Sequence, residues 1–478
     1  MIFIQTGIAK KSILSCAAVA TLCVSIASTS YAGGFMEDAQ ASLRLRNLLY
    51  DKDNRNGHSS SGSRSTEWGQ GIALSAQSGF TAGTVGFGLD LIAFYGLKLD
   101  SGGKAGDRES SRQPALLFPR ESDGSSVDNF SWAYVNPKLR VSKTEVSYGA
   151  HLPRLPIVQA TTGNIAPQLF EGTMITSRDI ENVTLVAGLY EKSKGRASSD
   201  AISMSISASS ASRNSFSSPF NQAVYGAPMP GAPKDSNHFW FAGAEYAMNP
   251  GVTLRYYYAQ LNDFYQQHML GALTKTPLGD GVLSGDFRYY DSSSQGKNGS
   301  FQGRLEGYLA GGYYGDGVTI GEVDNRLASV LFTYQYQGHS VGMGYQYTAG
   351  DSDFVWLNQG DGSIAPVTTD IQVNKFTRAG QRTTQLRYGY NFAAAGVPGL
   401  TFNWTYLQGR NAQTVDGPKS ENVQIIALGY AFQNGFLKGL GLRADKGIFH
   451  SSVHGVRDAT EYRPITDYAI PLRLSLHN

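Results

Sequence analysis

The chain has few groups of residues whose types and spacing could support catalysis or ligand binding. His450 and His454 are four residues apart, a spacing that suits two zinc ligands on a helix, but the glycine and serine around them predict a loop. The segment Gly83–Gly88 resembles a nucleotide-binding loop, yet its spacing is wrong and no helical pattern follows. Asp351 and Asp353 could begin a calcium site, although no further oxygen ligands continue it. We therefore expect no catalytic residues, no metal and no cofactor.

Alternating side chains over residues 385–406 predict a β-hairpin with two different faces. Apolar residues take every second position of both arms, namely Leu386, Tyr388, Tyr390 and Phe392, then Leu400, Phe402, Trp404 and Tyr406. Polar residues, including Arg387 and Thr405, fill the positions between them, and a period of two indicates strands. In a soluble sandwich the apolar face would meet a core. In a transmembrane β-barrel it would meet lipid while the polar face lines a lumen.

The same alternation recurs along the chain, and the series favours the barrel. Further segments with this pattern are 42–50, 72–76, 84–91, 239–246, 252–258, 327–336 and 341–347. Each signal alone is weak, as is usual for barrel strands, whose residues are only half apolar. The composition agrees, since 12% of residues are aromatic and 56 are glycine, and no long apolar run follows the N-terminal segment.

Residues 1–32 have the features of a secretory signal peptide. Lys10 and Lys11 precede an apolar stretch over residues 13–26, and Ser30-Tyr31-Ala32 offers small residues at both positions that a cleavage site requires. The alternative is an N-terminal membrane anchor, but this apolar run is shorter than the roughly 20 residues that a helix needs to cross a bilayer. Both cysteines of the chain lie within this segment, so the exported part has no disulfide and no cysteine-based zinc site.

Residues 33–478 are expected to form one β-barrel domain. Removal of the signal peptide takes away two lysines and no acids, which leaves equal numbers of basic and acidic residues. This balance argues against a nucleic-acid partner. The remaining length would suit either two or three soluble domains or one very large barrel.

The lengths of the connectors add an independent argument. Short turns are predicted at 79–83, 249–251, 337–339, 396–399 and 433–435, and long polar connectors at 51–65, 97–128, 191–237, 291–324, 348–380, 409–421 and 450–460. The two kinds largely alternate, as they do in outer-membrane barrels with periplasmic turns and extracellular loops. The sequence therefore predicts an all-β, transmembrane antiparallel β-barrel of about 18 strands, with 348–380 as a long extracellular loop.

Residues 150–176 are too apolar for an ordinary surface loop. They include Pro153, Arg154 and Pro156 and many aliphatic side chains. We expect this segment to fold into the barrel and constrict the channel, the alternative being a plain proline-rich surface loop. Asp351, which follows a predicted strand, is expected to give the channel an acidic mouth.

Several motifs resemble the OprD-type substrate-specific porins of Gram-negative bacteria, and they follow one another through nearly the whole mature chain. The most specific are Leu45-Arg46-Asn47, Glu67-Trp68-Gly69-Gln70-Gly71, the run Ser78–Gly88, the run Lys138–Glu145, Leu152-Pro153-Arg154-Leu155-Pro156, Gly344-Tyr345-Gln346 with Gly350-Asp351, and the run Gly396–Phe402. The resemblance implies an 18-stranded barrel in the outer membrane, a third loop folded inward, and a narrow channel for small carboxylate-bearing solutes such as amino acids or aromatic acids.

The resemblance also implies a column of basic side chains in the lumen that guides the carboxylate. The candidates in this chain are Arg46, Arg382, Arg387, Arg443 and Arg463. Alternation places four of them on polar faces, and Arg382 lies near the extracellular end of its strand, where we expect it to be the first station. The alternative is that these arginines only pair with lumen carboxylates such as Asp90, Asp445 or Asp467.

The chain departs from the family pattern at four positions that bear on this column. Gln381 stands where a glutamate is usual, and Asn164, Thr405 and Asp445 stand where arginines are common. We therefore hypothesise weaker anion selectivity than in typical members of the family.

Two other function classes remain open from the sequence. A barrel enzyme would need catalytic residues that converge on one rim, and no spacing suggests them. A secreted soluble β-rich adhesin would be recognised by its extraction without detergent. We expect a passive porin in contact with outer-membrane lipid, exported through the periplasm and either monomeric or trimeric.

Overall fold

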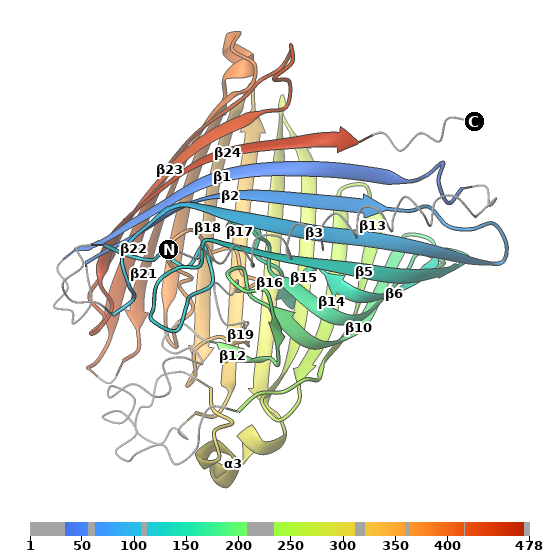
Figure 1. Cartoon of the computed structure of the whole chain (residues 1–478). Coiled ribbons are helices and arrows are strands. Elements are labelled where there is room, and N and C mark those ends of the chain that lie inside the picture. Colours follow the sequence, from blue (N-terminus) through green and yellow to red (C-terminus); the bar gives the residue numbers. More distant parts are fainter. Residues whose placement is uncertain are drawn as a thin grey trace, which may run out of the picture.

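Eighteen long antiparallel strands form a closed barrel in the computed structural model, which describes residues 34–55, 63–106, 112–207, 234–310, 321–358, 364–414 and 416–472 (Figure 1). The barrel strands are β1 (Gln40–Arg55), β2 (Arg64–Gln77), β3 (Val85–Ser101), β5 (Asn129–Val141), β6 (Thr144–His151), β9 (Leu169–Ser177), β10 (Val183–Lys194), β13 (Phe239–Asn249), β14 (Val252–Leu261), β15 (Tyr265–Leu278), β16 (Gly281–Ser294), β17 (Asp324–Tyr336), β18 (His339–Gly350), β20 (Arg382–Asn391), β21 (Leu400–Ala412), β22 (Lys419–Ala431), β23 (Gly441–Ser451) and β24 (Asp458–Leu472). The predicted fold class is confirmed.

Short elements decorate the connectors. They are β4 (Arg112–Gln113), β7 (Arg154–Leu155), β8 (Val158–Gln159), β11 (Ala201–Ile202), β12 (Ser205–Ser207), β19 (Trp356–Asn358), the 3-10 helices η2 (Gly296–Gly299) and η3 (Phe392–Ala395), and α3 (Phe301–Leu305). Among the described residues, no helix is long and apolar enough to cross a membrane. The predicted signal peptide, residues 1–32, lies outside the described part of the chain.

Each barrel strand pairs with the next one along the chain, and β24 returns to pair with β1. This seam runs from Ala41 opposite Leu472 to Arg55 opposite Asp458. A closed sheet leaves no row of unpaired backbone groups, which a bilayer could not hydrogen-bond. The seam therefore completes the structure that the alternating sequence requires.

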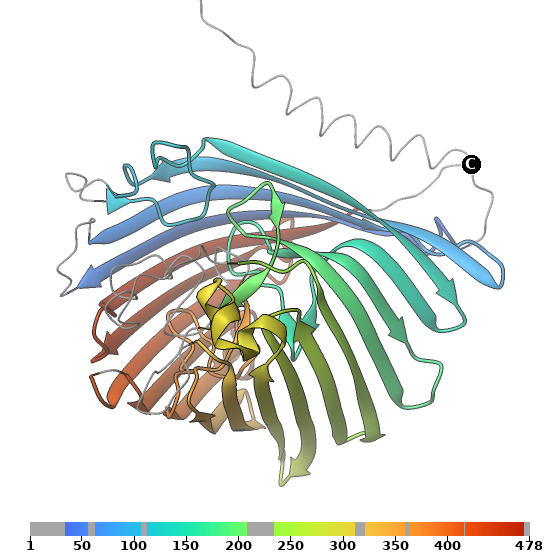
Figure 2. The same ribbon diagram turned by 90° about the horizontal axis from the view of Figure 1, so that it is seen from below.

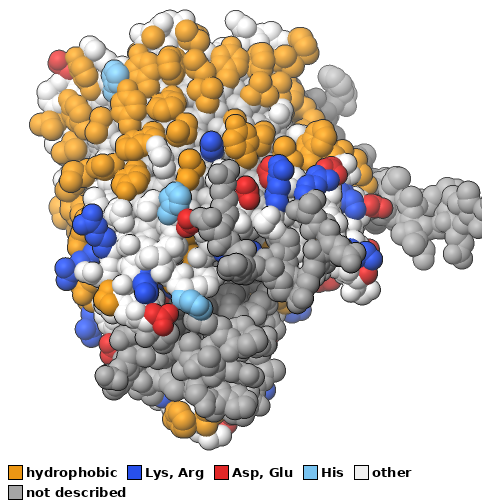
Figure 3. Space-filling model, turned by 90° about the vertical axis from the view of Figure 1, so that its left-hand side faces the viewer, with side chains coloured by type: hydrophobic (Ala, Val, Ile, Leu, Met, Phe, Trp, Pro, Cys, Tyr) orange, Lys and Arg blue, Asp and Glu red, His pale blue; other side chains and the backbone are white. Residues whose placement is uncertain are grey.

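The outer face of the barrel is apolar. Phe332, Met343 and Leu386 are cross-strand neighbours on β17, β18 and β20, and all three are exposed. The space-filling view shows hydrophobic side chains spread over this surface, with more polar atoms beyond its lower edge (Figure 3). Side chains with the opposite parity face the lumen, as the pleat of a strand dictates.

The two rims of the barrel differ in the length of their connectors. The turn between β17 and β18 consists of Gln337 and Gly338, whose φ angles of 44° and 83° suit a tight hairpin turn with both central residues in the left-handed region. We call this end the short-turn rim, and it lies at the top of Figure 1. The opposite, long-loop rim carries α3 and the long connectors, although β14 and β15 are joined there by only residues 262–264.

The connector between β6 and β9, residues 152–168, folds into the barrel. We call it the first inward loop. Its Ile157, Val158 and Ile165 are buried. The hydroxyl of Tyr290 on β16 donates to the carbonyl of Pro156 at 2.9 Å. The loop is shorter than the predicted 150–176, because β6 and β9 extend into both ends of that range.

A second connector also folds inward, which differs from the prediction for 348–380. Residues 364–381, here the second inward loop, include the buried Val367 and Phe376. The same hydroxyl oxygen of Tyr290 lies 2.7 Å from Pro366 O, so its one proton can be donated to either carbonyl and both loops meet at one tyrosine. Gly447 on β23 leaves room for the loop to pack against the inner face of the barrel, since a Cβ there would lie 2.8 Å from Val373 Cγ2. The view from the long-loop rim shows the ring of strands around these segments (Figure 2).

The assignment of faces predicts opposite responses to an added charge on one hairpin. Met343, 63% exposed, faces lipid, whereas Thr333 faces the lumen between Ser284 and Gly342. We expect Met343→Arg to lower the free energy of unfolding in lipid vesicles by about 2–4 kcal/mol, as for arginine near a bilayer midplane. Thr333→Arg should change it far less. Urea unfolding followed by tryptophan fluorescence measures both, and equal losses would contradict the assigned faces.

Candidate functional site

Three of the predicted arginines line one cavity in the lumen. Arg46 on β1, Arg443 on β23 and Arg463 on β24 share a cavity of about 490 Å³ with Thr162 and Gly163 of the first inward loop. The three side chains meet because β23, β24 and β1 are adjacent in the barrel and all three positions have lumen parity. The sequence therefore identified residues that the fold brings together.

Arg46 fixes the first inward loop to the wall. Its Nη1 donates to the carbonyls of Thr162 and Asn164 at 2.6 and 2.8 Å, and its Nη2 donates to Asp467 Oδ2 at 2.6 Å. Arg44 also pairs with Asp467, so two guanidinium groups share one carboxylate. Only 12% of the Arg46 side chain is exposed. Arg46 therefore contributes to the position of the loop as well as to the charge of the cavity.

Arg463 lies between the two inward loops. Its guanidinium carbon is 5.0 Å from the ring centroid of Tyr50, and it pairs with Glu461. The Tyr50 hydroxyl donates to the same carboxylate at 2.8 Å. Nη2 of Arg463 also donates to the carbonyl of Gln372 in the second inward loop at 3.3 Å. The charge is thus held beside both inward loops by contacts on several sides.

Arg443 is the most accessible of the three. Its Nε donates to Asp445 Oδ1 at 2.6 Å, and 57% of its side chain is exposed. Within the described residues, its two Nη groups form no hydrogen bond with the protein. Its Nη groups can therefore donate to a solute in the cavity, and its Asp445 partner adds a negative charge nearby.

A second group of arginines lies on the part of the wall that includes β14, β16 and β20. Arg387 on β20 donates to Thr368 O at 2.5 Å, and Arg288 on β16 donates to Pro366 O at 2.9 Å, so both bind the second inward loop. Asp286 accepts from Arg288 and also from Arg255 on β14. Arg255 and Arg288 were missed in the sequence, although each alternates with apolar neighbours: Leu254 and Tyr256, and Phe287 and Tyr289.

Arg382 does not face the lumen, and its prediction as a channel station was wrong. It pairs in register with Tyr347 on β18, and its guanidinium carbon lies 5.4 Å from the centroid of that ring. Tyr347 is on the outer face. Because Arg382 precedes Arg387 by an odd number of residues, the pleat places the two on opposite faces.

The residues predicted at the constriction and the mouth occupy different environments. Pro153 and Pro156 are buried, whereas Arg154 on the short hairpin β7–β8 is exposed. Asp351 is exposed at the long-loop rim, directly after β18. Its neighbour Asp353 is instead buried and accepts a hydrogen bond from the backbone of Ala379. Among the described residues, no group of His, Cys, Asp and Glu has an arrangement that could hold a metal ion.

The four positions that depart from the family pattern also have defined structural roles. Asn164 is buried and donates to Leu116 O, and Gln381 is buried and donates to Glu421 at 2.9 Å. Thr405 faces the lumen directly opposite Arg387. Asp445 pairs with Arg443. The predicted pairing of arginines with Asp445 and Asp467 is present, whereas Asp90 pairs with Lys138.

A second cavity lies toward the long-loop rim on the same wall. Its volume is about 390 Å³, and Lys52, Arg378 and Arg457 contribute to its lining together with Glu421. Arg378 pairs with Glu421 at 3.4 Å. Both cavities therefore carry cations whose neighbours include at least one carboxylate.

Comparisons with known proteins agree with this architecture. A family model described as outer membrane porin, OprD family, matches residues 33–472. The chain is 31% identical over 455 residues to the porin-like protein GalP of Pseudomonas putida, and the match covers 94% of this chain and 96% of GalP.

Solved structures of porins are similar over nearly the same length. The crystal structure of OccK8 (OprE) from Pseudomonas aeruginosa is 46% identical with a TM-score of 0.81, and the match covers 92% of this chain and all of OccK8. OpdK from the same organism, solved with vanillate, is 29% identical with a TM-score of 0.74 over 92% of this chain and all of OpdK. These relatives are channels rather than enzymes. The chain belongs to the OprD family of outer membrane porins.

Proposed function

We propose that this outer-membrane channel gives passive, selective diffusion to small solutes that carry a carboxylate, such as amino acids or aromatic acids. The observation that carries the proposal is the convergence of Arg46, Arg443 and Arg463 on one lumen cavity beside the first inward loop. A guanidinium group keeps its charge at any physiological pH and can hold a carboxylate through two parallel hydrogen bonds. Arg443 offers its Nη groups for such a contact.

The two cavities suggest a route along one wall of the barrel. A solute that enters near Lys52 and Arg457 would pass Arg463, which lies between the inward loops, and then reach Arg443. Successive weak sites favour permeation, because each attracts the ion without trapping it. Cations along a narrow, low-dielectric path also raise the local concentration of anions.

The chemistry of one relative supports the same solute class. OpdK was solved with vanillate, an aromatic carboxylate, and its structure matches this chain over 92% of the residues. This similarity supports small carboxylates as the solute class of this channel.

We further propose that anion selectivity is weak. Arg443 pairs with Asp445, Arg463 with Glu461, and the two arginines of β1 share Asp467. Each pair is a local dipole, so a passing anion meets a carboxylate close to each of these four guanidinium groups. At 4 Å a single charge contributes about 1 kcal/mol even in water, so these acids offset much of the attraction.

Arg443→Gln is expected to reduce selectivity for carboxylates while the barrel stays intact. The substitution removes the exposed cation and leaves the loop contacts of Arg46 and Arg463 in place. We expect the blocking constants of benzoate and glutamate to rise about fivefold, because the variant loses roughly 1 kcal/mol of attraction for the carboxylate. Planar-bilayer recordings give the blocking constant. Arg382→Gln is the matched control, since that arginine faces away from the lumen; an equal effect of both variants would refute the proposed site.

Asp445→Asn should have the opposite effect on selectivity. Loss of this carboxylate leaves the charge of Arg443 uncompensated, and the relative permeability to chloride should rise by up to about fivefold. Reversal potentials in a KCl gradient measure this ratio. Strong anion selectivity in the unaltered protein would contradict the proposal that the paired acids weaken it.

Arg46→Ala is expected to widen the channel. The change removes two hydrogen bonds to the first inward loop and leaves Asp467 with one arginine partner. Loss of charge-assisted bonds of this kind costs about 1.5–3 kcal/mol each, so the loop should leave the wall more often. We expect larger and noisier single-channel conductance, whereas Arg443→Gln should leave the noise unchanged. A quiet channel of unaltered conductance would show that Arg46 does not hold the loop.

A further inference from the structure

Two arginines lie side by side on the outer surface of the barrel, where the neighbouring wall meets lipid. Arg382 on β20 and Arg410 on β21 are directly opposite each other in register. Both are exposed. The adjacent lumen-facing residues, Thr383 and Gly409, confirm the parity, because the Cβ position of Gly409 lies near Gln381 and Phe376 inside the barrel.

This arrangement is unfavourable without a counterion. Like charges directly opposite each other on neighbouring strands destabilise a sheet. Within the described part of the chain, neither Arg382 nor Arg410 forms an ion pair with an acidic side chain. The nearby Arg326, also on the outer face, does have such a partner, Asp291, at 3.7 Å. The pair Arg382–Arg410 therefore presents two positive charges to an anion that the protein does not supply.

The height of the pair corresponds to the head-group region of the membrane. Outward aromatic side chains lie beside it. Tyr347 is in register with Arg382 and lies against it, and Tyr406 lies on the short-turn side of Arg410 on β21. Trp404 stacks on Tyr406 with ring centroids 6.3 Å apart. Aromatic girdles of this kind mark the membrane interface in barrels. On the face shown in Figure 3, Lys and Arg side chains likewise lie beyond the edge of the hydrophobic surface.

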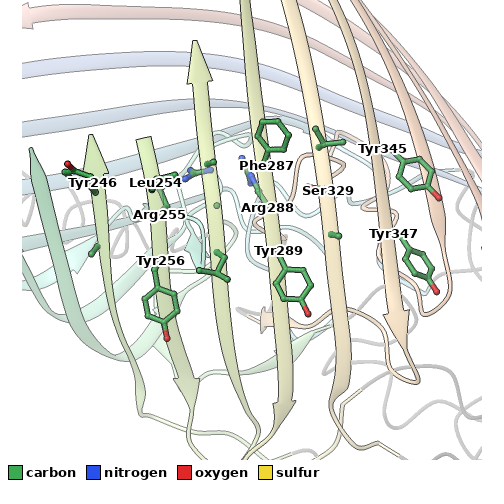
Figure 4. Close-up of a pocket in the computed structure, with 16 residues that line it drawn as sticks. Tyr246, Leu254, Arg255, Tyr256, Phe287, Arg288, Tyr289, Ser329, Tyr345 and Tyr347 are labelled. Atoms are coloured by element: carbon green, nitrogen blue, oxygen red, sulfur yellow. The ribbon is translucent and has the colours of Figure 1, made fainter. Parts of the chain in front are cut away.

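An apolar groove on the lipid-facing surface reaches the same place. It has a volume of about 850 Å³ and extends across β13–β18 as far as Tyr345 and Tyr347. Ala328 lies between Tyr289 and Tyr347 in register, so a small side chain separates two aromatic ridges. Figure 4 shows Tyr256, Tyr289 and Tyr347 along this surface. Tyr347 thus belongs both to the groove and to the contact with Arg382.

We propose that this surface binds a phosphorylated glycolipid of the outer leaflet. Its phosphates bind between Arg382 and Arg410, and an acyl chain lies in the groove beside Ala328 and Tyr347. Arginine suits this role because its planar fork can form two hydrogen bonds with a phosphate. Basic residues at the membrane surface attract anionic head groups, and apolar surface retains the chains. The site lies outside the channel and is independent of the solute that the channel carries.

The test compares binding of fluorescent lipid A, a glycolipid with two phosphates, to the purified full-length protein in dodecyl maltoside micelles. Arg382→Gln combined with Arg410→Gln should raise the dissociation constant at least about tenfold, because two basic contacts are lost. Arg326→Gln is the matched control: it removes an outward arginine that already has an acidic partner, and it should change binding by less than about twofold. Equal losses in the two variants would overturn the proposal.

Further measurements distinguish the contribution of the phosphorylated head group to binding from that of the acyl chain. Dephosphorylated lipid A should bind the unaltered protein as weakly as lipid A binds the double variant. Ala328→Phe places a large side chain in the groove. It should weaken the binding of lipid A and leave single-channel conductance unchanged. If pyrophosphate displaces lipid A completely, or if phosphatidylglycerol binds equally well with the same dependence on both arginines, the glycolipid site is refuted. Altered ion selectivity in Arg382→Gln would also refute it, since this side chain would then face the lumen.

Discussion

The closure of the sheet is the constraint on which the rest of this structure depends. A bilayer offers no partner for a free backbone N–H or C=O group, so the strands must satisfy one another all the way around. The seam between β1 and β24 accomplishes this over most of the length of both strands, from Ala41 to Arg55. Once the barrel is closed and its register fixed, the pleat assigns each strand side chain to the lipid or to the lumen. A slip of one residue would exchange the two faces.

Closure turns the lumen into a confined space in which charges need partners. Each of the lumen arginines described above meets that need with a carboxylate, a backbone carbonyl or both. The carbonyls come from the two inward loops: Arg46 binds the first, and Arg288 and Arg387 bind the second. The same side chains that bring positive charge into the lumen therefore also hold the two inward loops.

The alternating pattern predicted the barrel and the lumen position of Arg46, Arg387, Arg443 and Arg463, because parity is a local property of the sequence. The lengths of the connectors predicted the two rims. It did not predict that residues 364–381 fold inward, since this depends on contacts with distant residues such as Gly447 and Tyr290. Arg255 and Arg288 alternate with apolar neighbours as clearly as the others and needed only the same reasoning. Arg382 lies near the mouth, but its parity on β20 places it on the outer face, so closeness to the mouth does not predict a lumen position.

Arg382 and Arg387 show how one strand places the same side chain in two solvents. Arg387 faces the lumen, where Gln385 and the carbonyl of Thr368 accept its hydrogen bonds. Arg382 stands above Tyr347 on the outer face beside Arg410, where the protein provides an aromatic ring and no carboxylate among the described residues. The hydrogen bonds of Arg387 are thus made inside the fold, whereas Arg382 points away from it. An odd number of residues along β20 thus decides whether an arginine faces the lumen or the lipid.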